Sequence, residues 1–417
     1  MTSRWRWLLG LITRRLWFRA TLISLLAVGA ALLSLLVSPY LPEGMSTKIG
    51  ADSVDRILQI IASSMLAVTT FSLSTMVSAY SAATSNVTPR ATRLLIEDTT
   101  TQNTLATFVG SFLYSLVAII TLSMGAYGER GRVVLFAVTV LVIALIVITL
   151  LRWIDYLLRL GRVGETSAQV ERAATNAMQV RREQPNLGGV PMAEGELAPE
   201  TARPIYSSRV GYVQHVDMGD LDGAAQVAGA TIYVVALPGA YVHPGRPLAY
   251  VDAPENEAFE TEIRDAFSVG AERSFDQDPR FGLCVMAEIA SRALSPAVND
   301  PGTAIDVIGR VVRVLGVWAK ETDTKIQFEN VHVPGLALSE LFDDVFKPIA
   351  RDGASIAEVQ IRLQKAFVAL AAYGDQQRYA SNARRHAREA LARAKQAIIF
   401  KPDFERVEAA AELAVKD

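Results

Sequence analysis

The stretch VVLFAVTVLVIALIVITLL, residues Val133–Leu151, decides the fold of this chain. It contains 19 residues, none of them charged, and most are Val, Ile or Leu. About 20 apolar residues in one helix cross the hydrocarbon core of a bilayer. Three earlier windows without a charged residue have 18, 24 and 23 residues: Ala20–Val37, Ile57–Tyr80 and Thr104–Ala126. The sequence therefore predicts four transmembrane helices, at about residues 18–38, 57–80, 104–126 and 133–153.

Charged residues divide the chain into two parts. Positions 1–165 hold 14 of the 41 Lys and Arg and 8 of the 43 Asp and Glu, a formal charge of +6. The remaining positions hold 27 basic and 35 acidic residues, a formal charge of −8. Only 20% of all residues are charged, against about 25% in ordinary globular proteins. The predicted fold class is a membrane α-helical domain over residues 1–165, joined to a cytoplasmic α+β domain.

Composition also excludes several classes of protein. The chain is too hydrophobic to be disordered as a whole, and its 27 glycines show no triplet period, which excludes collagen. The single Cys284 excludes an intramolecular disulfide and a zinc site built from thiolates. Duplex binding needs clustered cations, so the acidic second part predicts no nucleic acid as partner.

Basic residues that flank the spans predict the topology, because they favour the cytoplasmic side. Five arginines precede the first window, and basic residues also follow the second and fourth windows. Both termini are therefore expected in the cytoplasm, with the loop at 38–56 outside. The first window exceeds the apolar region of a signal peptide, so we expect a retained anchor. We predict a multi-pass protein of the bacterial inner membrane, with the lipid bilayer as partner.

The second span carries many hydroxyl groups. At 100° per residue, small or hydroxylated residues form one stripe, namely Ser63, Ala67, Thr70, Ser74 and Ser78. Such residues suit close packing between membrane helices. The same stripe suits the wall of a water-filled path made by several subunits. We favour packing, because no span contains an ionisable residue that would mark an ion relay.

Beyond the fourth span the chain is expected to continue as a stalk helix to about Arg182. Residues 183–204 are rich in Pro and Gly, which marks a linker and a domain boundary. Runs of β-branched and aromatic residues then predict a small β module. The predicted organisation is a stalk helix and linker at 166–204, a small β module at 205–253 and a mainly helical cytoplasmic domain at 254–417.

Two Asp-Pro pairs mark the starts of two predicted helices. The first helix is predicted from about Pro279 to Leu294, and the second restarts with Asn299 or Asp300 as N-cap and Pro301 in its first turn. These pairs lie in the densest polar group of the sequence. Its candidate residues are Asp276, Asp278, Arg292, Ser295, Asn299, Asp300 and Thr303.

Three interpretations of this polar group stay open. Its carboxylates are ligands of the kind that Mg²⁺ and Ca²⁺ prefer. Alternatively, the amides that open the second helix hold an anion, with Arg292 nearby. In the third, Asn299 and Asp300 only cap the helix, while Arg292 pairs with Asp276 or Asp278. We favour this structural interpretation, because capping alone requires the residue order.

The sequence contains no recognisable catalytic constellation. Its four histidines lie far apart, and none forms a metal-binding pair with a neighbouring His or Glu. It has neither a phosphate loop nor a nucleophile elbow. Cys284 lies in an apolar helical pattern, which is typical of a core residue. We therefore predict a protein that is not an enzyme and carries no cofactor.

Several short phrases carry a resemblance to a known family. They are Gln277-Asp278, Phe281-Gly282, Ile289-Ala290, Arg292-Ala-Leu-Ser-Pro296 and Asn299-Asp-Pro301, behind four predicted spans. With these phrases the chain resembles, over most of its length, a bacterial family of predicted membrane proteins known as a domain of unknown function. The resemblance implies an integral membrane protein with a cytoplasmic domain. It implies no activity and no catalytic residue.

Two functional hypotheses follow from these patterns. We predict a homo-oligomer with a channel-like or transport role that the cytoplasmic domain regulates. The alternative is a membrane-anchored sensor or scaffold that binds a metal, an anion or a protein partner. An ion or a small molecule is the expected ligand. A membrane-tethered enzyme has the least support, since no nucleophile and base are recognisable together.

Overall fold

The computed structural model describes residues 4–13, 15–37, 51–193, 195–196, 198–320, 325–373 and 376–415. They form two compact units. The membrane unit comprises Leu8–Ser85 and Thr92–Glu165, and the α+β unit comprises Met1–Trp7, Asn86–Ala91 and Thr166–Asp417. Most of the predicted external loop, at 38–50, lies outside the described residues.

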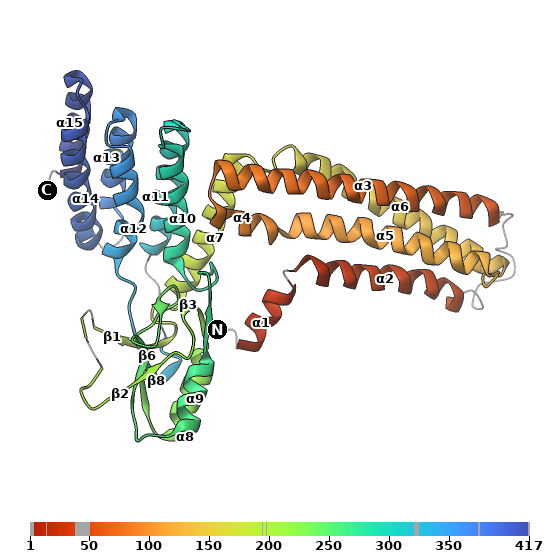
Figure 1. The fold of residues 1–417 in the computed structure, drawn as a ribbon, viewed down its shortest axis with the longest axis horizontal. Coiled ribbons are helices and arrows are strands. Elements are labelled where there is room, and N and C mark those ends of the chain that lie inside the picture. Colours follow the sequence, from red (N-terminus) through yellow and green to blue (C-terminus); the bar gives the residue numbers. More distant parts are fainter. Residues whose placement is uncertain are drawn as a thin grey trace. The chain divides into compact units, whose positions relative to one another are not determined.

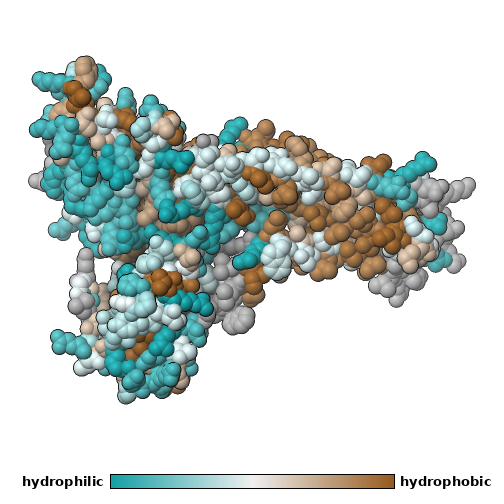
Figure 2. Space-filling model, viewed as in Figure 1, coloured by the Kyte–Doolittle hydropathy of each residue, from teal (hydrophilic) through white to brown (hydrophobic). Residues whose placement is uncertain are grey.

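Long apolar helices build the membrane unit (Figure 1). They are α2 (Leu16–Val37), α3 (Ala51–Asn86), α5 (Thr99–Ser123) and α6 (Glu129–Leu157), accompanied by the shorter α1 (Arg4–Thr13) and α4 (Pro89–Ile96). The four long helices are apolar enough to cross a bilayer, which confirms the four predicted spans. Apolar side chains gather over the surface of this unit (Figure 2), as a lipid solvent requires.

Polar groups join the helices inside the membrane unit. The Tyr127 hydroxyl donates to the Ala31 carbonyl at 2.8 Å. The indole N–H of Trp153 donates to Ser72 Oγ at 2.9 Å, and both of these residues are buried. Hydrogen bonds between membrane helices contribute about 0.6 kcal/mol each on average. Ser72 is therefore a hydroxyl of α3 that takes part in packing against α6.

A turn separates the fourth span from the next helix, so the expected continuous stalk is corrected. α6 ends at Leu157, and α7 (Val163–Glu183) begins after a short connection. Gly161 in this connection has a φ of +79°, which glycine adopts without a steric penalty. A Cβ at this position would also lie 3.4 Å from the Ala79 Cα. The connection therefore turns at this glycine before α7 begins.

Two sheets form the β part of the α+β unit. The five-stranded sheet has the order β1-β8-β4-β6-β2, in which β1 and β4 pair parallel with β8 and the other pairs are antiparallel. An antiparallel sheet has the order β5-β3-β7. Together with α8 (Met218–Ala228) and α9 (Glu257–Ala266) they enclose one apolar core. The strands are β1 (Gly189–Met192), β2 (Arg203–Tyr206), β3 (Gly211–Val216), β4 (Thr231–Val234), β5 (Tyr241–Val242), β6 (Pro247–Asp252), β7 (Phe267–Gly270) and β8 (Phe328–Pro334).

The β part draws on residues outside the predicted module at 205–253. β1 comes from the stretch predicted as a linker, and β8 comes from the part predicted as mainly helical. β1 is an edge strand, where a sheet tolerates the missing N–H of Pro191. Pro191 pairs with Val333, far along the chain. Parallel strands need a long crossover, so local patterns do not reveal this pairing.

A layer of helices completes the α+β unit (Figure 1). It contains α10 (Pro279–Ala293), α11 (Pro301–Trp318), α12 (Leu338–Asp352), α13 (Ala357–Ala371), α14 (Gln376–Ala397) and α15 (Lys401–Val415). α10 packs on α11 and α12, and α13 packs on α11, α14 and α15. α7 approaches α10 so closely that a Cβ at Gly282 would lie 2.4 Å from the Ala174 Cβ. This contact holds α7 against the first turn of α10.

Candidate functional site

The hydroxylated stripe of α3 lies on an exposed face of that helix. Ser63, Thr70, Ser74 and Ser78 are all exposed in the single chain. Each hydroxyl donates to the α3 backbone carbonyl four residues earlier, at 2.9 to 3.0 Å. Figure 2 shows pale, weakly polar side chains among apolar ones along α3. Within the described part of the chain, the stripe is therefore not covered by helix packing.

The candidate residues of the polar group are divided between the two ends of α10. Asp276 and Asp278 precede this helix, whereas Arg292 lies in its last turn and Asp300 begins α11. α10 has 15 residues, so a rise of 1.5 Å per residue separates its ends by about 22 Å. The candidates therefore do not converge on one ligand. Among the described residues, no group of three or more His, Cys, Asp or Glu is arranged to hold a metal ion.

At the start of α11 the candidates form a helix cap. Asp300 is the N-cap, and its carboxylate accepts the Thr303 N–H at 3.1 Å and the Thr303 hydroxyl at 2.6 Å. These hydrogen bonds lower the pKa of Asp300, because they favour the carboxylate. Asn299 precedes the cap with a φ of +49°, which Asn tolerates better than most residues. Ser295 Oγ donates to the Arg292 carbonyl at 2.7 Å, which closes the corner.

Arg273, and not Arg292, pairs with the aspartate at the start of α10. Its Nε and Nη2 donate to the two carboxylate oxygens of Asp278 at 2.7 and 3.1 Å. Arg292 is exposed at the far end of α10, so its predicted pairing with Asp276 or Asp278 is wrong. The helix between them keeps these groups apart. Asp276 instead accepts the indole N–H of Trp7 at 3.1 Å.

Asp278 is a buried N-cap. Only 1% of its surface is exposed, and it accepts the Phe281 N–H at 3.2 Å. Gly239 lies so close, at a φ of +93°, that a Cβ there would lie 2.2 Å from Asp278 Oδ2. Burial raises the pKa of the Asp278 carboxyl, while the Arg273 guanidinium opposes this rise. The ion pair with Arg273 therefore stabilises the charged form of Asp278.

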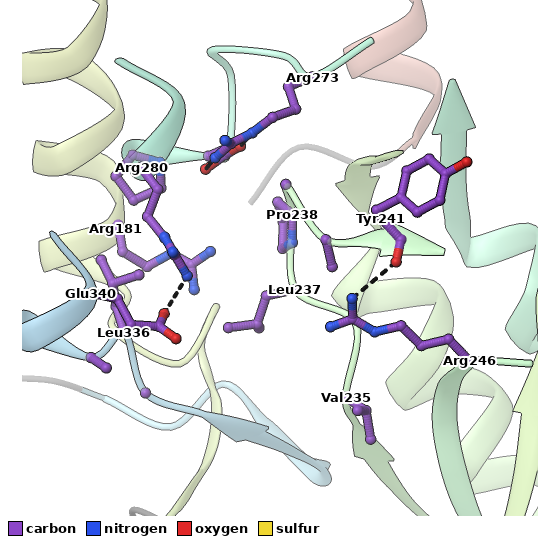
Figure 3. Close-up of a pocket in the computed structure, with 16 residues that line it drawn as sticks. Arg181, Val235, Leu237, Pro238, Tyr241, Arg246, Arg273, Arg280, Leu336 and Glu340 are labelled. Atoms are coloured by element: carbon purple, nitrogen blue, oxygen red, sulfur yellow. Dashed lines mark hydrogen bonds and ion pairs between the residues drawn. The ribbon is translucent and has the colours of Figure 1, made fainter. Parts of the chain in front are cut away.

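Beside this ion pair lies a cavity of about 440 Å³ (Figure 3). Segments far apart in the sequence form it: the end of α7, the connections after β4 and β5, and the starts of α10 and α12. Part of the wall is apolar, with Val235, Leu237, Pro238, Ala240 and Leu336. Its charged side chains are Arg181, Arg246, Arg273, Arg280, Asp278 and Glu340.

Arg181 is the most deeply buried arginine of the cavity. Its residue surface is 2% exposed. Nη2 donates to the Gln277 carbonyl at 3.3 Å, and Nη1 donates to the Pro185 carbonyl at 3.5 Å. Burial lowers the pKa of Arg181 to about 10, and the charge of Asp278 opposes this effect. The guanidinium therefore remains charged at neutral pH.

Cys284 lies in α10 near the same ion pair. Its Sγ is 3.5 Å from Arg273 Nη1. Burial raises the pKa of the thiol to about 11, so the thiolate is scarce at neutral pH. The Cys284 thiol is therefore expected to be unreactive at neutral pH.

Sequence reasoning identified Asp278 but missed the arginines of the cavity. Arg181 lies in the helix that was expected to be a stalk, and Arg246 lies in the connection between β5 and β6. One signal was available for Arg181. It continues a buried face of α7 whose other members include Val170, Ala174 and Ala177. A cation at the end of an apolar stripe is a candidate for a buried charge.

The fold and the site together define a polytopic helical membrane protein with an α+β unit that encloses a charged cavity. The chain belongs to the family described as Predicted membrane protein (DUF2254), whose model matches residues 13–369. This membership confirms the family resemblance found in the sequence.

Mycobacterial proteins are similar to this chain. Uncharacterized protein Mb1321c of Mycobacterium bovis and Uncharacterized protein Rv1290c of Mycobacterium tuberculosis are each 28% identical to it over 273 residues. Each alignment covers 63% of this chain and 52% of the relative. The chain therefore spans about half the length of these curated relatives. No solved structure matches the chain.

Proposed function

We propose that this protein self-associates in the membrane and that α3 of several copies lines a conduction path, which the α+β unit regulates. The exposed hydroxyl face of α3 carries this proposal. The opposite face of α3, with Leu58, Ile61 and Met65, is buried in the bundle. α3 thus turns apolar residues inward and a hydroxylated face outward. Water or a second copy suits that face better than lipid does.

The hydroxyls of α3 serve two different purposes in this proposal. Ser72 is buried and accepts the hydrogen bond from Trp153, so it stabilises the bundle. Ser74 and Ser78 are exposed, and within the described part of the chain their hydroxyls donate to carbonyls of their own helix. Their hydroxyl oxygens keep lone pairs for water. A path lined in this way, without ionisable groups, is expected to be weakly selective.

A chain connection supports regulation by the α+β unit. Residues Asn86–Ala91, which directly follow the span of α3, belong to that unit. Within it, Thr88 Oγ1 donates to Glu288 of α10 at 2.9 Å, and Arg90 forms an ion pair with the same carboxylate. α10 also contributes its first turn to the charged cavity. A shift of α10 would therefore be transmitted to the end of α3.

The same unit supports an orientation. The N-terminal residues up to Trp7, the segment Asn86–Ala91 and the chain from Thr166 onward all belong to the α+β unit. Each of these segments lies beside a span end whose flanking basic residues predict a cytoplasmic location. We place the α+β unit in the cytoplasm, beneath the bacterial inner membrane. A green fluorescent protein fused after the last residue should then fluoresce in intact cells, and an alkaline phosphatase fusion should be inactive. The reverse pattern would overturn the orientation.

Cysteine accessibility tests the conduction path. In a Cys284→Ser background in liposomes, a water-soluble thiosulfonate should modify Ser74→Cys about tenfold faster than Leu73→Cys, because only a wet position supplies thiolate. Leu73 is the matched control, since this residue is 47% exposed and lies about 100° around the helix from Ser74. Modification of Ser74→Cys should also reduce ion flux. Equal rates at the two positions, or liposomes that pass no ion or small osmolyte, would refute the path.

The alternative function is a membrane-anchored sensor. The charged cavity of the α+β unit favours it, because a buried cation beside apolar walls is suited to an anionic ligand. A sensor requires no conduction. Ligand binding without any flux would therefore favour this second function.

A further inference from the structure

We infer that the cavity of the α+β unit is a binding site for a phosphate-bearing ligand, held by Arg181 and Arg246. The inference goes beyond the conduction path, because it concerns a site inside the α+β unit alone. Its ligand class is an organic phosphate with an apolar body. The shared chemistry is the phosphate group, which either a soluble metabolite or a lipid headgroup supplies.

The first argument is the balance of charge in the cavity. Of its four arginines, Arg273 pairs with Asp278. Arg280 forms ion pairs with Glu340 and, at 2.7 Å, with Asp344. Neither Arg181 nor Arg246 has a carboxylate within 4.0 Å among the residues that the structure describes. Two cations thus remain for an anion.

The second argument is the burial of Arg181. Removing a charge from water without a partner is strongly unfavourable. Among the described residues, Arg181 has two backbone carbonyls at hydrogen-bond distance, both at 3.3 Å or more. The nearby charge of Asp278 favours the charged guanidinium but forms no ion pair with it within 4.0 Å. A phosphate in the cavity would add a direct anionic partner and accept two N–H groups of the planar guanidinium. Arg246 is exposed and donates one N–H to the Tyr241 carbonyl at 3.0 Å. Its other N–H groups remain available for a ligand.

The third argument is the start of α12. Gly335, Leu336 and Ala337, which precede and cap this helix, line the cavity. No side chain caps the helix at Ala337. The first amides of a helix lack partners within it and form the positive end of its dipole, which favours phosphate. The helix start therefore brings the positive end of a helix dipole to the cavity wall, which adds to the charge of the two arginines.

The apolar residues of the cavity wall favour a particular chemistry for the part of the ligand beyond its phosphate. Figure 3 shows Arg181 and Arg280 on one side of the space and Arg246 on the other, with Leu237 and Pro238 between them. Apolar side chains between cations favour a ligand that carries an apolar or planar body beside its anionic group. Inorganic phosphate alone would leave this surface uncovered. An organic phosphate should therefore bind more tightly.

Binding to the whole 417-residue chain in phospholipid-free detergent tests the site. By titration calorimetry at constant ionic strength, we expect phenyl phosphate to bind about tenfold more tightly than inorganic phosphate, and chloride not to compete. Arg181→Met and Arg246→Gln should each weaken phenyl phosphate binding about tenfold or more. Arg292→Gln, at the far end of α10, is the matched control and should leave binding unchanged. If Arg181→Met does not fold, Arg246→Gln still tests the site, because Arg246 is exposed and its replacement does not disturb the core.

A second arm distinguishes the two sources of phosphate. Nanodiscs containing phosphatidic acid should displace phenyl phosphate from the wild-type site if a lipid headgroup is the ligand, and should not do so if the ligand is soluble. Either result supports the site when Arg246→Gln reduces binding. The inference is overturned if the wild type binds phenyl phosphate no better than Arg181→Met and Arg246→Gln do. It is also overturned if neither phosphate nor phosphatidic acid binds.

Discussion

Replacing Asp278 with alanine is expected to destabilise the helical layer of the α+β unit by about 3–5 kcal/mol, the usual effect of breaking a buried ion pair. The change leaves the guanidinium of Arg273, only partly exposed, without its carboxylate. It also removes the side-chain N-cap of α10, so the Phe281 N–H keeps only the backbone carbonyl of residue 278 as acceptor. Arg181 loses the nearby negative charge that favours its charged form. All three effects act in the same direction.

Asp300→Ala is the matched control for this prediction. Asp300 is likewise an N-cap aspartate before a proline, but it is exposed and forms no ion pair with a described residue. Its loss should cost about 1 kcal/mol, the usual value for a cap. Hydrogen exchange of α10 and α11 in the whole 417-residue chain in detergent measures both effects. Similar losses for the two variants would contradict the view that burial and pairing distinguish Asp278.

Acidification from pH 7 to pH 4 is expected to lower the stability of the same layer by about 3 kcal/mol through His386 alone. This side chain is 2% exposed and lies among the rings of Phe342, Phe346 and Phe367. Burial lowers its pKa to about 4, and the charge of Arg385 acts in the same direction. Glu389 and Asp343 oppose the shift, Asp343 with Oδ1 at 3.1 Å from Nε2.

The sign of the pH effect follows from proton binding. The unfolded chain protonates this histidine near its ordinary pKa of about 6.5, whereas the folded chain does so only near pH 4. Between these values the unfolded state binds more protons, so acidification favours unfolding. The contribution of His386 is fully present above pH 6.5 and is lost as the pH falls towards 4.

His386→Gln removes this titration and should flatten the pH dependence between 6.5 and 4.5. Hydrogen exchange of α12 and α14 at several pH values, corrected for the intrinsic exchange rate, gives the local free energies. His243→Gln is the matched control, because His243 is exposed. If His386→Gln keeps the same slope as the wild type, another group causes the pH dependence.

Local sequence signals predicted several elements of this fold well. The uncharged windows located the four spans, because a bilayer demands about 20 apolar residues in one helix. The Asp-Pro pairs located the starts of α10 and α11, because capping and the fixed φ of proline act within a few residues. These signals act within one helix, so they are independent of how the rest of the chain folds.

Other features were wrong or missed because they depend on distant parts of the chain. Pairing of Arg292 with Asp276 or Asp278 assumed a compact corner, but α10 separates these residues by its full length. β1 pairs with β8 across most of the α+β unit's sequence, so its Gly- and Pro-rich strand was predicted as a linker. The direction that the α3 stripe faces also depends on which side of the helix the bundle covers.

The sequence by itself determined where the chain enters the bilayer, which residues begin α10 and α11, and the family to which it belongs. These properties follow from hydrophobicity, capping and short motifs, which act over one helix or less. Only the tertiary structure decided that Arg181 is buried in the wall of a cavity that Arg246 and Arg280 also line, and that Asp278 is paired with Arg273. Segments that are far apart in the sequence contribute the charged residues of the cavity. No local sequence pattern can therefore predict its net charge.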